Sequence, residues 1–457
     1  MSAIPDLIKI GSIPTDMDMS VDTDTLEPVV KSNTFCRFTL MNKGFMNSFS
    51  KIILGMDALA TNGSRNTYPM NIGISSLIQR AVLKVGAKTI SETEDFGHFM
   101  AYKSLFIDPS INKEREQVLS GRGVALELRY QNASGNFSDF NASSYGLDNG
   151  NTYIASGQVA GAGARVGLLP YEWQELQKAP EFQISLADLF PFLRFNSLPL
   201  YMFDEQISVE LFFNSTDGTR MVGPSGVPAT AINESGLKLI ADYIYYDGET
   251  MEQFANANRD MNFQYVDYQL NKRTLTKAQA ETKQILNVGG AGRLVSKCFS
   301  SMSNDTPDDT SILNIYHSEA PSITVVSGAR QMGILTSNIR YNDRYLYPLD
   351  RSSNAIHFHD ITSAEAMVPH ISRDMYSGGG EGLTGEVFNG QRQDTNLKAQ
   401  FFWQSHRLNR NERINSRGIE YEQRFSTIGA GPFTQRTYIE VVKQAQLRNG
   451  VLDINFA

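Results

Sequence analysis

Two histidines stand two positions apart in the segment His357-Phe358-His359-Asp360, a spacing that places both imidazoles on one face of a strand. Imidazole is a common zinc ligand, so the pair could contribute to a metal site. A complete site needs a third and a fourth ligand, and His370 is the nearest further histidine. We therefore interpret this segment as a polar loop, and a metal site remains the alternative.

Residues 380–385 read Gly-Glu-Gly-Leu-Thr-Gly, which matches the glycine fingerprint of dinucleotide-binding proteins. The fingerprint requires a strand before it and a helix after it, because the helix N-terminus binds the pyrophosphate. Here glycines precede it and residues 386–390 lack helical character, so we predict a loop. The sequence contains no P-loop, serine-hydrolase elbow, HExxH motif or cysteine-nucleophile signature. We therefore predict no catalytic residue, cofactor-binding residue or metal ligand, and we expect the chain not to be an enzyme.

Four arginines recur at intervals of three, three and four residues, at Arg407, Arg410, Arg413 and Arg417. If this segment were helical, all four would share one face. Such a face could bind carboxylates of a neighbouring protein or contact packaged nucleic acid. Our first interpretation is a solvated charged surface with partners in the same chain.

Two further residue types could carry covalent modification. Cys36 and Cys298 lie far apart on predicted strands, and we expect buried free thiols there, not a disulfide. The Asn-x-Ser/Thr pattern occurs at Asn62, Asn132, Asn136, Asn141, Asn214, Asn233 and Asn304. We attribute it to the preference of loops for Asn and Ser, because the sequence opens without the basic-then-apolar leader of a secretory signal peptide.

The composition of the 457-residue chain favours many short strands joined by turns, since 26 Phe and 19 Tyr are interspersed with 36 Gly and many Asn and Ser. No apolar run approaches the roughly 20 residues that cross a bilayer. The net charge of −8 repels phosphate, so coating nucleic acid is not the expected main role.

The most informative segment for the fold runs from Ile184 to Phe213. Ser185 followed by Asp188 predicts a capped helical turn, which Pro191 and Pro199 then end. From Ile207 onward apolar and polar side chains alternate, apart from Phe212, as in a half-buried strand. The pattern predicts a short apolar plug between two strands, with Phe190, Phe192 and Leu193 buried.

The amino-acid sequence of segment 184–213 resembles a segment in the first jelly roll of the double jelly-roll major capsid proteins of virophages, polinton-like viruses and related large DNA viruses. A second segment, 237–269, is similar to the strand and short helix that join the two rolls in that family. Residues 74–90 are similar to the family's early hairpin. The matching residues of the second segment are Asp242, Tyr243, Ile244, Tyr245, Asp247, Glu249, Phe254 and Ala255.

The resemblance implies an all-β chain of two tandem eight-stranded jelly rolls with a few short helices. It further implies a homotrimer that forms pseudo-hexameric capsomers of an icosahedral shell around a double-stranded DNA genome. Neighbouring capsomers, penton proteins and minor capsid proteins would be the partners, with no specific nucleic acid and no membrane span. The protein would reside in the virion after synthesis inside the host cell.

The chain divides by pattern into an acidic N-terminal arm, 1–30, a first roll, 31–250, a linker helix, 251–262, and a second roll, 263–457. The arm lacks sustained periodicity, so we expect it to order only against neighbours. Segment 130–150 is polar and predicts an exposed loop. Strands are predicted at 35–40, 50–54, 313–316, 323–326, 338–347, 399–404 and 451–456.

A weak internal repeat accompanies this division. The segment at 35–40 is similar in pattern to 293–298, and the hairpin at 82–90 is similar to 339–347. Two copies of one sandwich fused in tandem would leave such a repeat.

Two other functions compete with that of a capsid protein. The first is a β-sandwich glycan-binding or host-attachment protein, and the second is an enzyme on a jelly-roll scaffold.

Overall fold

The computed structural model of the protein describes most of both predicted rolls. The described residues are 19–54, 67–68, 72–106, 119–120, 128–130, 165–168, 171–172, 182–194, 197–214, 236–303, 323–326, 329–332, 335–352, 354–365, 387–388, 391–392, 403–408, 412–425 and 432–456. Three segments discussed above lie outside the described residues, namely 131–150, 313–316 and 380–385. Of the predicted loop 130–150, the structure describes Tyr130 alone.

The first sandwich consists of two antiparallel sheets. Their strand orders are β12-β5-β15-β4-β13, with β1 along the other side of β15, and β2-β3-β14-β7-β8. The bounds are β1 Ser20–Leu26, β2 Val30–Lys31, β3 Phe35–Leu40, β4 Phe45–Met46, β5 Lys51–Leu54, β7 Ile78–Val85, β8 Lys88–Glu94, β12 Phe182–Ser185, β13 Leu198–Pro199, β14 Ile207–Phe213 and β15 Leu237–Tyr245.

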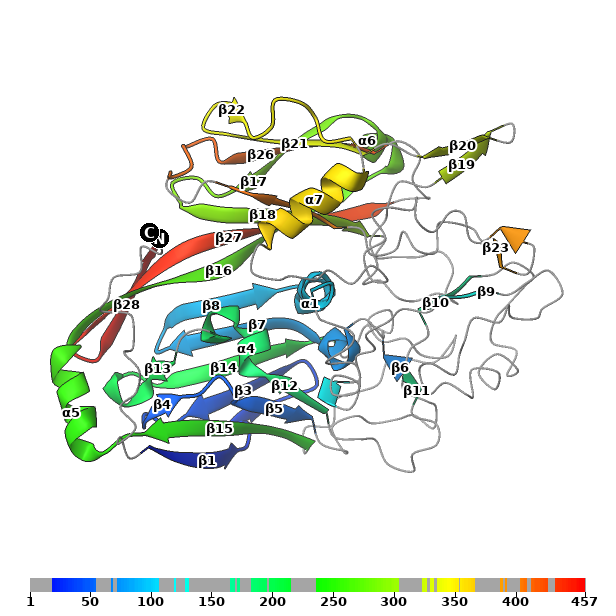
Figure 1. Cartoon of the computed structure of the whole chain (residues 1–457). Coiled ribbons are helices and arrows are strands. Elements are labelled where there is room, and N and C mark those ends of the chain that lie inside the picture. Colours follow the sequence, from blue (N-terminus) through cyan, green and yellow to red (C-terminus); the bar gives the residue numbers. More distant parts are fainter. Residues whose placement is uncertain are drawn as a thin grey trace.

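The second sandwich also has two sheets, β16-β27-β18-β25, with β28 on β27, and β17-β26-β21-β22. The bounds are β16 Asp260–Leu275, β17 Gln284–Gly289, β18 Val295–Ser303, β21 Leu335–Tyr341, β22 Arg344–Tyr345, β25 Gln404–Arg407, β26 Ile419–Phe425, β27 Phe433–Arg448 and β28 Val451–Phe456. In Figure 1 the second sandwich lies above the first, with β22 at the top and β1 at the bottom.

Short helices connect these strands: η2 Gly73–Leu77, α1 Phe96–Ser104, α4 Leu186–Leu189, η4 Pro191–Arg194, η5 Leu200–Met202, α5 Gly248–Ala257, α6 Lys277–Glu281 and α7 Asn354–Ala364. Separate two-stranded ribbons pair β6 Thr67–Tyr68 with β11 Tyr171–Glu172, β9 Leu128–Tyr130 with β10 Arg165–Leu168, β19 Ile323–Val326 with β20 Ala329–Met332, and β23 Val387–Phe388 with β24 Gln391–Arg392.

Both sandwiches have the same topology. In the first, the successive strands are β1, β3, the broken pair β4 and β5, β7, β8, β12, β14 and β15. In the second, they are β16, β17, β18, β21, β22, β25, β26 and β27. Each time, one sheet has the order first-eighth-third-sixth and the other second-seventh-fourth-fifth. This is the arrangement of a jelly roll, so the prediction of two tandem jelly rolls is confirmed.

This equivalence corrects half of the predicted internal repeat. The hairpins at 82–90 and 339–347 correspond, because β7–β8 and β21–β22 are the fourth and fifth strands of their rolls. The segments at 35–40 and 293–298 do not, since β3 is a second strand and β18 a third. Alternating side chains look alike in any half-buried strand, so the pattern could not distinguish these two positions.

The N-terminal segment differs from the expected arm over residues 20–31. Strand β1 pairs residue by residue with β15, from Ser20 opposite Tyr245 to Leu26 opposite Leu239. Leu26 packs on the core, and Lys43 holds β1 through Asp22 at 2.8 Å. Alternating Val and Thr residues favour a strand here despite the acidic residues between them. Residues 20–26 are therefore an integral first strand of the first roll.

The predicted plug is confirmed. Ser185 caps α4 by accepting a hydrogen bond from the Ala187 amide at 3.1 Å. Asp188 does not close the predicted capping pair but bonds Arg194 at 2.6 Å. The plug side chains Phe190, Phe192 and Leu193 are buried, and the Phe192 ring contacts Tyr265 of the second roll with centroids 5.1 Å apart.

Strand β14 is more deeply buried than the predicted half-buried strand. It lies between β3 and β7 in the centre of its sheet, and even Ser208 and Glu210 on its polar face are buried. The Glu210 carboxylate is paired with the Lys84 ammonium at 2.6 Å. The alternation of apolar and polar side chains correctly assigned residues to the two faces of the strand. It could not reveal that the polar face is buried as well.

Helix α5 overlaps the linker helix predicted at 251–262 but begins three residues earlier, and the chain is already in strand β16 at Asp260. Asp247 caps it by accepting a hydrogen bond from the Thr250 amide at 3.2 Å. Its Phe254 packs edge-on against Phe45 of the first roll, with centroids 5.1 Å apart. The helix connects β15, the last strand of the first roll, to β16, the first strand of the second.

Candidate functional site

The most elaborate arrangement of side chains lies at the junction of the two rolls. Helix α1 of the first roll presents Phe96, Phe99 and Tyr102 at intervals of three residues, which places them on neighbouring turns. Tyr102 stacks on Phe299 of β18 with centroids 3.9 Å apart and planes 8° apart, and Phe299 in turn stacks on Tyr438 of β27. These rings belong to one buried apolar cluster that extends through both rolls.

Asp95 is the polar centre of this junction. It precedes α1 with a left-handed backbone, φ 48°. Its carboxylate accepts hydrogen bonds from Arg436 Nε at 2.6 Å and His98 Nδ1 at 2.8 Å, and Lys272 lies at 3.3 Å. Burial alone would raise the pKa of Asp95, but His98 and Arg436 outweigh it and hold the pKa well below its usual value. The carboxylate thus stays charged and ties the first roll to β16 and β27.

A second buried network surrounds Lys297 on β18. Its ammonium contacts Glu365, just beyond α7, at 2.5 Å and Glu440 of β27 at 3.2 Å. Tyr102 of the first roll donates to Glu365 at 2.7 Å, and Tyr268 donates to Glu440 at 2.7 Å. Burial alone would raise the pKa of Glu440, but Lys297 and the hydrogen bonds lower it to about 2. Each carboxylate is therefore matched by a cation and a hydroxyl donor.

The third set of contacts joins β8 to β16. Tyr265 donates a hydrogen bond to the Ile90 carbonyl at 2.6 Å, and Ser91 donates to Asp267 at 2.8 Å. Lys443 forms a short ion pair with Asp267. The edge strand β8 of the first roll is thereby tied to side chains of β16 and β27, and its Ile90 carbonyl is already hydrogen-bonded within the chain.

These networks are built to hold surfaces together. Buried charges are expensive unless they are paired and hydrogen-bonded, and here each is. A carboxyl with a pKa of about 2, such as Glu440, cannot exchange protons near neutrality as a general acid or base must. The junction therefore supports rigid docking of the two rolls.

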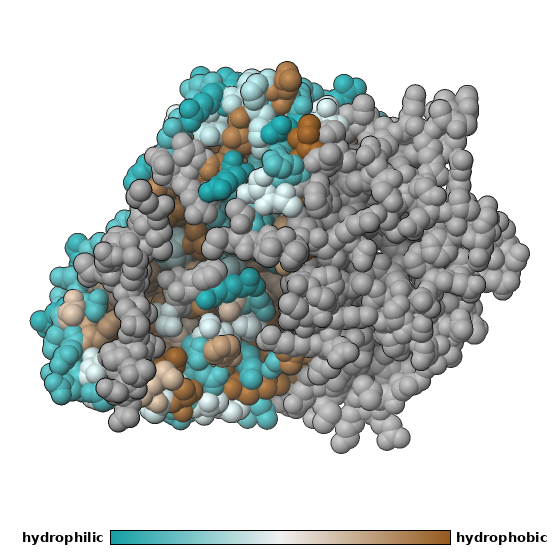
Figure 2. Space-filling model, viewed as in Figure 1, coloured by the Kyte–Doolittle hydropathy of each residue, from teal (hydrophilic) through white to brown (hydrophobic). Residues whose placement is uncertain are grey.

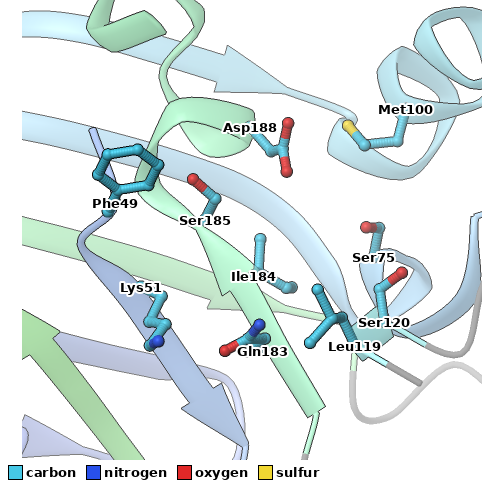
Figure 3. Close-up of a pocket in the computed structure, with 10 residues that line it drawn as sticks. All are labelled: Phe49, Lys51, Ser75, Met100, Leu119, Ser120, Gln183, Ile184, Ser185 and Asp188. Atoms are coloured by element: carbon cyan, nitrogen blue, oxygen red, sulfur yellow. The ribbon is translucent and has the colours of Figure 1, made fainter. Parts of the chain in front are cut away.

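A small surface pocket lies at the edge of the first roll, where β12 and β5 meet η2 and α1 (Figure 3). Its volume is about 200 Å³. Small-molecule sites usually measure roughly 300–1,000 Å³. The Phe49 ring at its rim is 73% exposed, while the Asp188 carboxylate is already bonded to Arg194. The pocket offers an aromatic surface beside polar groups but no set of groups that could carry out a reaction.

The predicted strand or polar loop at the histidine pair is instead helix α7. Residues two apart on a helix point about 200° apart, so the imidazoles cannot share a metal ion. His357 is buried, whereas His359 is exposed and contacts Ser363. His370 lies outside the described residues, among which no cluster of three or more potential ligands occurs.

The four arginine positions do not lie on a helix among the described residues, so the condition under which they would share one face is not met. Arg407 ends strand β25, Arg413 forms a bridge to Leu294, and Arg417 pairs with Asp343 at 2.5 Å on the surface. Arg410 is not among the described residues. Extended and turning backbone separates these side chains, because the chain here must enter and leave the strands of two sheets.

The structure describes both cysteines and one of the Asn-x-Ser/Thr asparagines, and all three residues are buried. Cys36 and Cys298 are both free and buried, as predicted, and burial raises the pKa of each thiol to about 12. Asn214 is buried and donates a hydrogen bond to the Ser76 carbonyl at 3.1 Å, so a glycan could not occupy it in the folded chain. The other six Asn-x-Ser/Thr asparagines lie outside the described residues.

Sequence reasoning missed the charged residues of the junction. Asp267, Lys297, Glu440 and Lys443 lie within strands, where a charged residue normally faces solvent. The one sequence feature that could have indicated their burial is their position among aromatic residues such as Tyr268. Charged residues beside aromatic residues also occur on exposed faces, so this feature was not decisive. Within the part of the chain that the structure describes, no helix is long and apolar enough to cross a membrane.

Comparison with known proteins gives structural matches alone. No protein-family model and no curated protein sequence matches the chain. The PBCV-1 virus capsid protein superposes with a TM-score of 0.55 at 10% identity, covering 98% of this chain and 99% of that chain. A chain of the Sputnik virophage gives 0.54 at 9% identity, covering 100% and 93%. The Faustovirus major capsid protein gives 0.51 at 9% identity, covering 96% and 92%.

Such a match over nearly the full length of both chains agrees with the repeated strand order, which requires two complete jelly rolls in tandem. At these identities the likeness is one of fold. The chain has the double jelly-roll fold of viral major capsid proteins.

Proposed function

We propose that the protein is the major structural subunit of a viral capsid. The observation that carries this proposal is the pair of topologically identical sandwiches, docked through a buried junction into one block. Three such blocks around an axis present six similar sandwiches, and the result is a near-hexagonal tile. Such tiles can pave an icosahedral shell around a double-stranded DNA genome.

The role is one of surfaces and involves no reaction centre. The partners are two further copies in a homotrimer, neighbouring capsomers, and penton and minor capsid proteins at special positions of the shell. The acidic net charge of −8 argues against close coating of the genome. The protein accordingly resides in the virion shell.

The proposed units are the rolls at 31–250 and 263–457, joined by a linker at 251–262. The strand assignments support a boundary near α5, because among the described residues no sheet contains strands from both sides of it. We propose to revise the start of the first roll to about residue 20, since β1 supplies its first strand. We also propose to shift the linker to helix α5, 248–257, and the start of the second roll to Asp260, where β16 begins.

A second candidate, glycan binding during host attachment, rests on the pocket beside Phe49. An exposed aromatic ring next to polar side chains such as Gln183 can stack on a sugar. A glycan array with the purified protein tests this candidate, and the variant Phe49→Ala should abolish any signal that arises from the pocket.

Native mass measurement tests the capsid proposal. We expect a trimer at low micromolar concentration that persists in moderate salt, because apolar burial is not screened by ions. Electron microscopy of co-expressed or reassembled material should then show particles. A monomer at these concentrations would overturn the proposal.

A further inference from the structure

Helix α7 docks on the second roll through a side that is mostly ionisable. His357, Asp360 and Ile361 are buried and lie three and four residues apart, so they share one side of the helix. Glu365, directly after the helix, continues that side, and its side chain is 11% exposed. Surface helices usually dock through an apolar stripe. Here three of the four buried residues can gain or lose a proton, so the docking of α7 can respond to pH.

The helix packs along β25, which among the described strands pairs with β18 alone. Figure 1 shows α7, in yellow, above α1 of the first roll. Glu365 accepts a hydrogen bond from Tyr102 of α1 at 2.7 Å, so α7 joins the interior of the second roll to the first roll. Figure 2 shows hydrophilic residues on the visible face of the second roll, and His359 on the outer side of α7 is exposed.

His406 of β25 is 0% exposed, and both of its ring nitrogens are hydrogen-bonded. The Tyr421 hydroxyl donates its hydrogen to Gln404 Oε1, so it must accept the hydrogen bond from His406 Nε2 at 3.3 Å. His406 Nδ1 is then the unprotonated nitrogen, and it accepts from the Tyr347 hydroxyl at 3.0 Å. The site therefore fits a neutral imidazole, because a second ring proton would point at a hydroxyl that already donates.

The other groups around His406 do not compensate a second ring proton. Asp360 Oδ2 lies 3.2 Å from Arg351 Nε and 3.9 Å from His406 Nδ1, yet it accepts no hydrogen bond among the described residues. Burial, His357 and Arg351 lower the pKa of His406 from 6.5 to about 3. The titratable and charged side chains that face it are Tyr347 and Arg351 after β22, His357 and Asp360 on α7, Tyr421 on β26 and Cys298 on β18.

The two carboxyls of the docked side respond differently to acid. Burial raises the pKa of Asp360, so the docked helix binds a proton there more readily than a released helix, and this group opposes release. Burial would also raise the pKa of Glu365, but Lys103 and Lys297 outweigh it and lower the pKa, so Glu365 stays charged between pH 7 and pH 5. Among these groups with shifted pKa values, His406 is the one whose protonation favours release in that range.

We propose that α7 is an acid-released latch, a helix that is docked at neutral pH and detaches from β25 between roughly pH 6 and pH 5, while the sheets of both rolls stay folded. His406 takes up a proton when the helix detaches. The contact from Glu365 to Tyr102 is lost with the helix, so the junction between the rolls loosens. This inference concerns regulation and goes beyond the proposed function. In a capsid subunit such a latch would make the block of two rolls less rigid in an acidic compartment.

Hydrogen exchange of the full-length protein tests the latch. After correction for the intrinsic pH dependence of exchange, protection of the α7 amides should fall about twentyfold from pH 7 to pH 5, because uptake of one proton on release changes the opening constant by up to about tenfold per pH unit. At pH 5 these amides should exchange about tenfold or more faster than those of the β16–β27 ladder, which open only with the whole fold. Equal protection of helix and ladder, or protection of α7 that does not change with pH, would overturn the proposal.

Variants assign the pH dependence to His406. His406→Gln keeps a donor and an acceptor for Tyr421 and Tyr347 but cannot take up a proton, so protection of α7 should become nearly independent of pH. His359→Gln, on the exposed side of the same helix, is the matched control and should keep the full pH dependence. Asp360→Asn removes the opposing carboxyl and should leave the dependence at least as steep as in the parent. A merely structural effect changes absolute protection and not its pH dependence, so a parental pH dependence in His406→Gln contradicts the latch.

The native cysteines give a measurement that needs no variant. Cys298 lies opposite His406 in the ladder of β18 and β25, whereas Cys36 lies in the first roll, and both are 0% exposed. Burial raises the pKa of each thiol to about 12, so a dipyridyl disulfide, which reacts with thiols in acid, compares the two on equal terms. At pH 5 Cys298 should react about tenfold or more faster than Cys36, because release of α7 uncovers Cys298 alone. Equal rates would count against the latch.

The outcomes separate the latch from the capsid proposal. A monomeric parent whose α7 is released in acid would refute the capsid function and support the latch. A trimeric parent whose α7 stays protected at pH 5 would leave the capsid function standing and refute the latch.

Discussion

Tyr102 of the first roll and Phe299 of the second stack face to face, with ring centroids 3.9 Å apart and planes 8° apart. The two residues are far apart in sequence, and they meet because α1 projects from the first roll onto the outer face of β18. Burial of two aromatic rings contributes several kcal/mol, roughly 2–3 for each. The rolls are therefore joined through their cores, and we expect them to hold a fixed relative orientation.

The plug should be essential to stability. Phe192→Ala removes a buried ring that contacts Tyr265 across the junction, and such truncations cost about 3–5 kcal/mol. We expect a clear loss of free energy of unfolding in denaturant titrations. Phe49→Ala is the control, because a ring that is 73% exposed should cost little. Equal stability of the Phe192→Ala variant and the parent would show that the plug is not part of the core.

The buried ion pair at Asp95 should matter far more than a surface pair. Arg436→Met leaves Asp95 without its closest cation and should destabilise the protein by about 3–5 kcal/mol. Arg417→Met breaks the exposed pair with Asp343 and should cost at most about 1 kcal/mol. Chemical denaturation of both variants measures the difference. Similar costs would contradict the role of Asp95 in joining the rolls.

The stability should decline on acidification in two steps. Burial lowers the pKa of His406 from 6.5 to about 3, so below pH 6.5 the unfolded chain takes up a proton that the folded chain refuses. The pKa of Glu440 falls from 4.5 to about 2, so the unfolded chain takes up another proton below pH 4.5. In both cases stability falls as the pH falls, by up to about 1.4 kcal/mol per pH unit for each group.

The variant His406→Gln isolates the first step. It removes the titrating imidazole, which contacts Tyr347 and Tyr421, and replaces it with a neutral polar group. The difference in melting temperature between pH 7 and pH 5 should be smaller in this variant than in the parent, whatever its absolute stability. An unchanged difference would exclude His406 as the source of the first step.

Truncation should distinguish the two parts of the N-terminal segment. Removing residues 1–18 leaves β1 intact and should yield a folded protein with near-parental stability. Removing residues 1–27 deletes the strand that pairs with β15 from Ser20 to Leu26 and uncovers part of the core beside Leu26. We expect the longer truncation to be poorly soluble or to melt at markedly lower temperature. Equal melting of both truncations would contradict the integral role of β1.

Local sequence was sufficient wherever a structure depends on neighbours along the chain. Strands at 35–40, 323–326 and 451–456 have the predicted bounds, because side-chain alternation and turn residues act over a few positions. The cap at Ser185 was recognised for the same reason. The fold class, two jelly rolls in tandem, followed from these elements together with the resemblance of two segments to a known family.

Local reading was less successful at the edges of sheets. A strand was predicted at 399–404, whereas strand β25 spans Gln404–Arg407. Residues 20–26 read as an acidic arm, yet pairing with β15 makes them a strand. The pairing partner is more than two hundred residues away, so no local pattern could reveal it.

Tertiary structure alone decided which surfaces are buried and which charges meet. Asp95 meets Arg436 and Lys297 meets Glu440 because the outer face of one roll's sheet docks on the other roll. The alternation within β18 and β27 is the same whether their outer face contacts water or protein. Sequence therefore determined the strands, the caps and the repeated roll, whereas the packing of one roll on the other selected the charged residues that became part of the core.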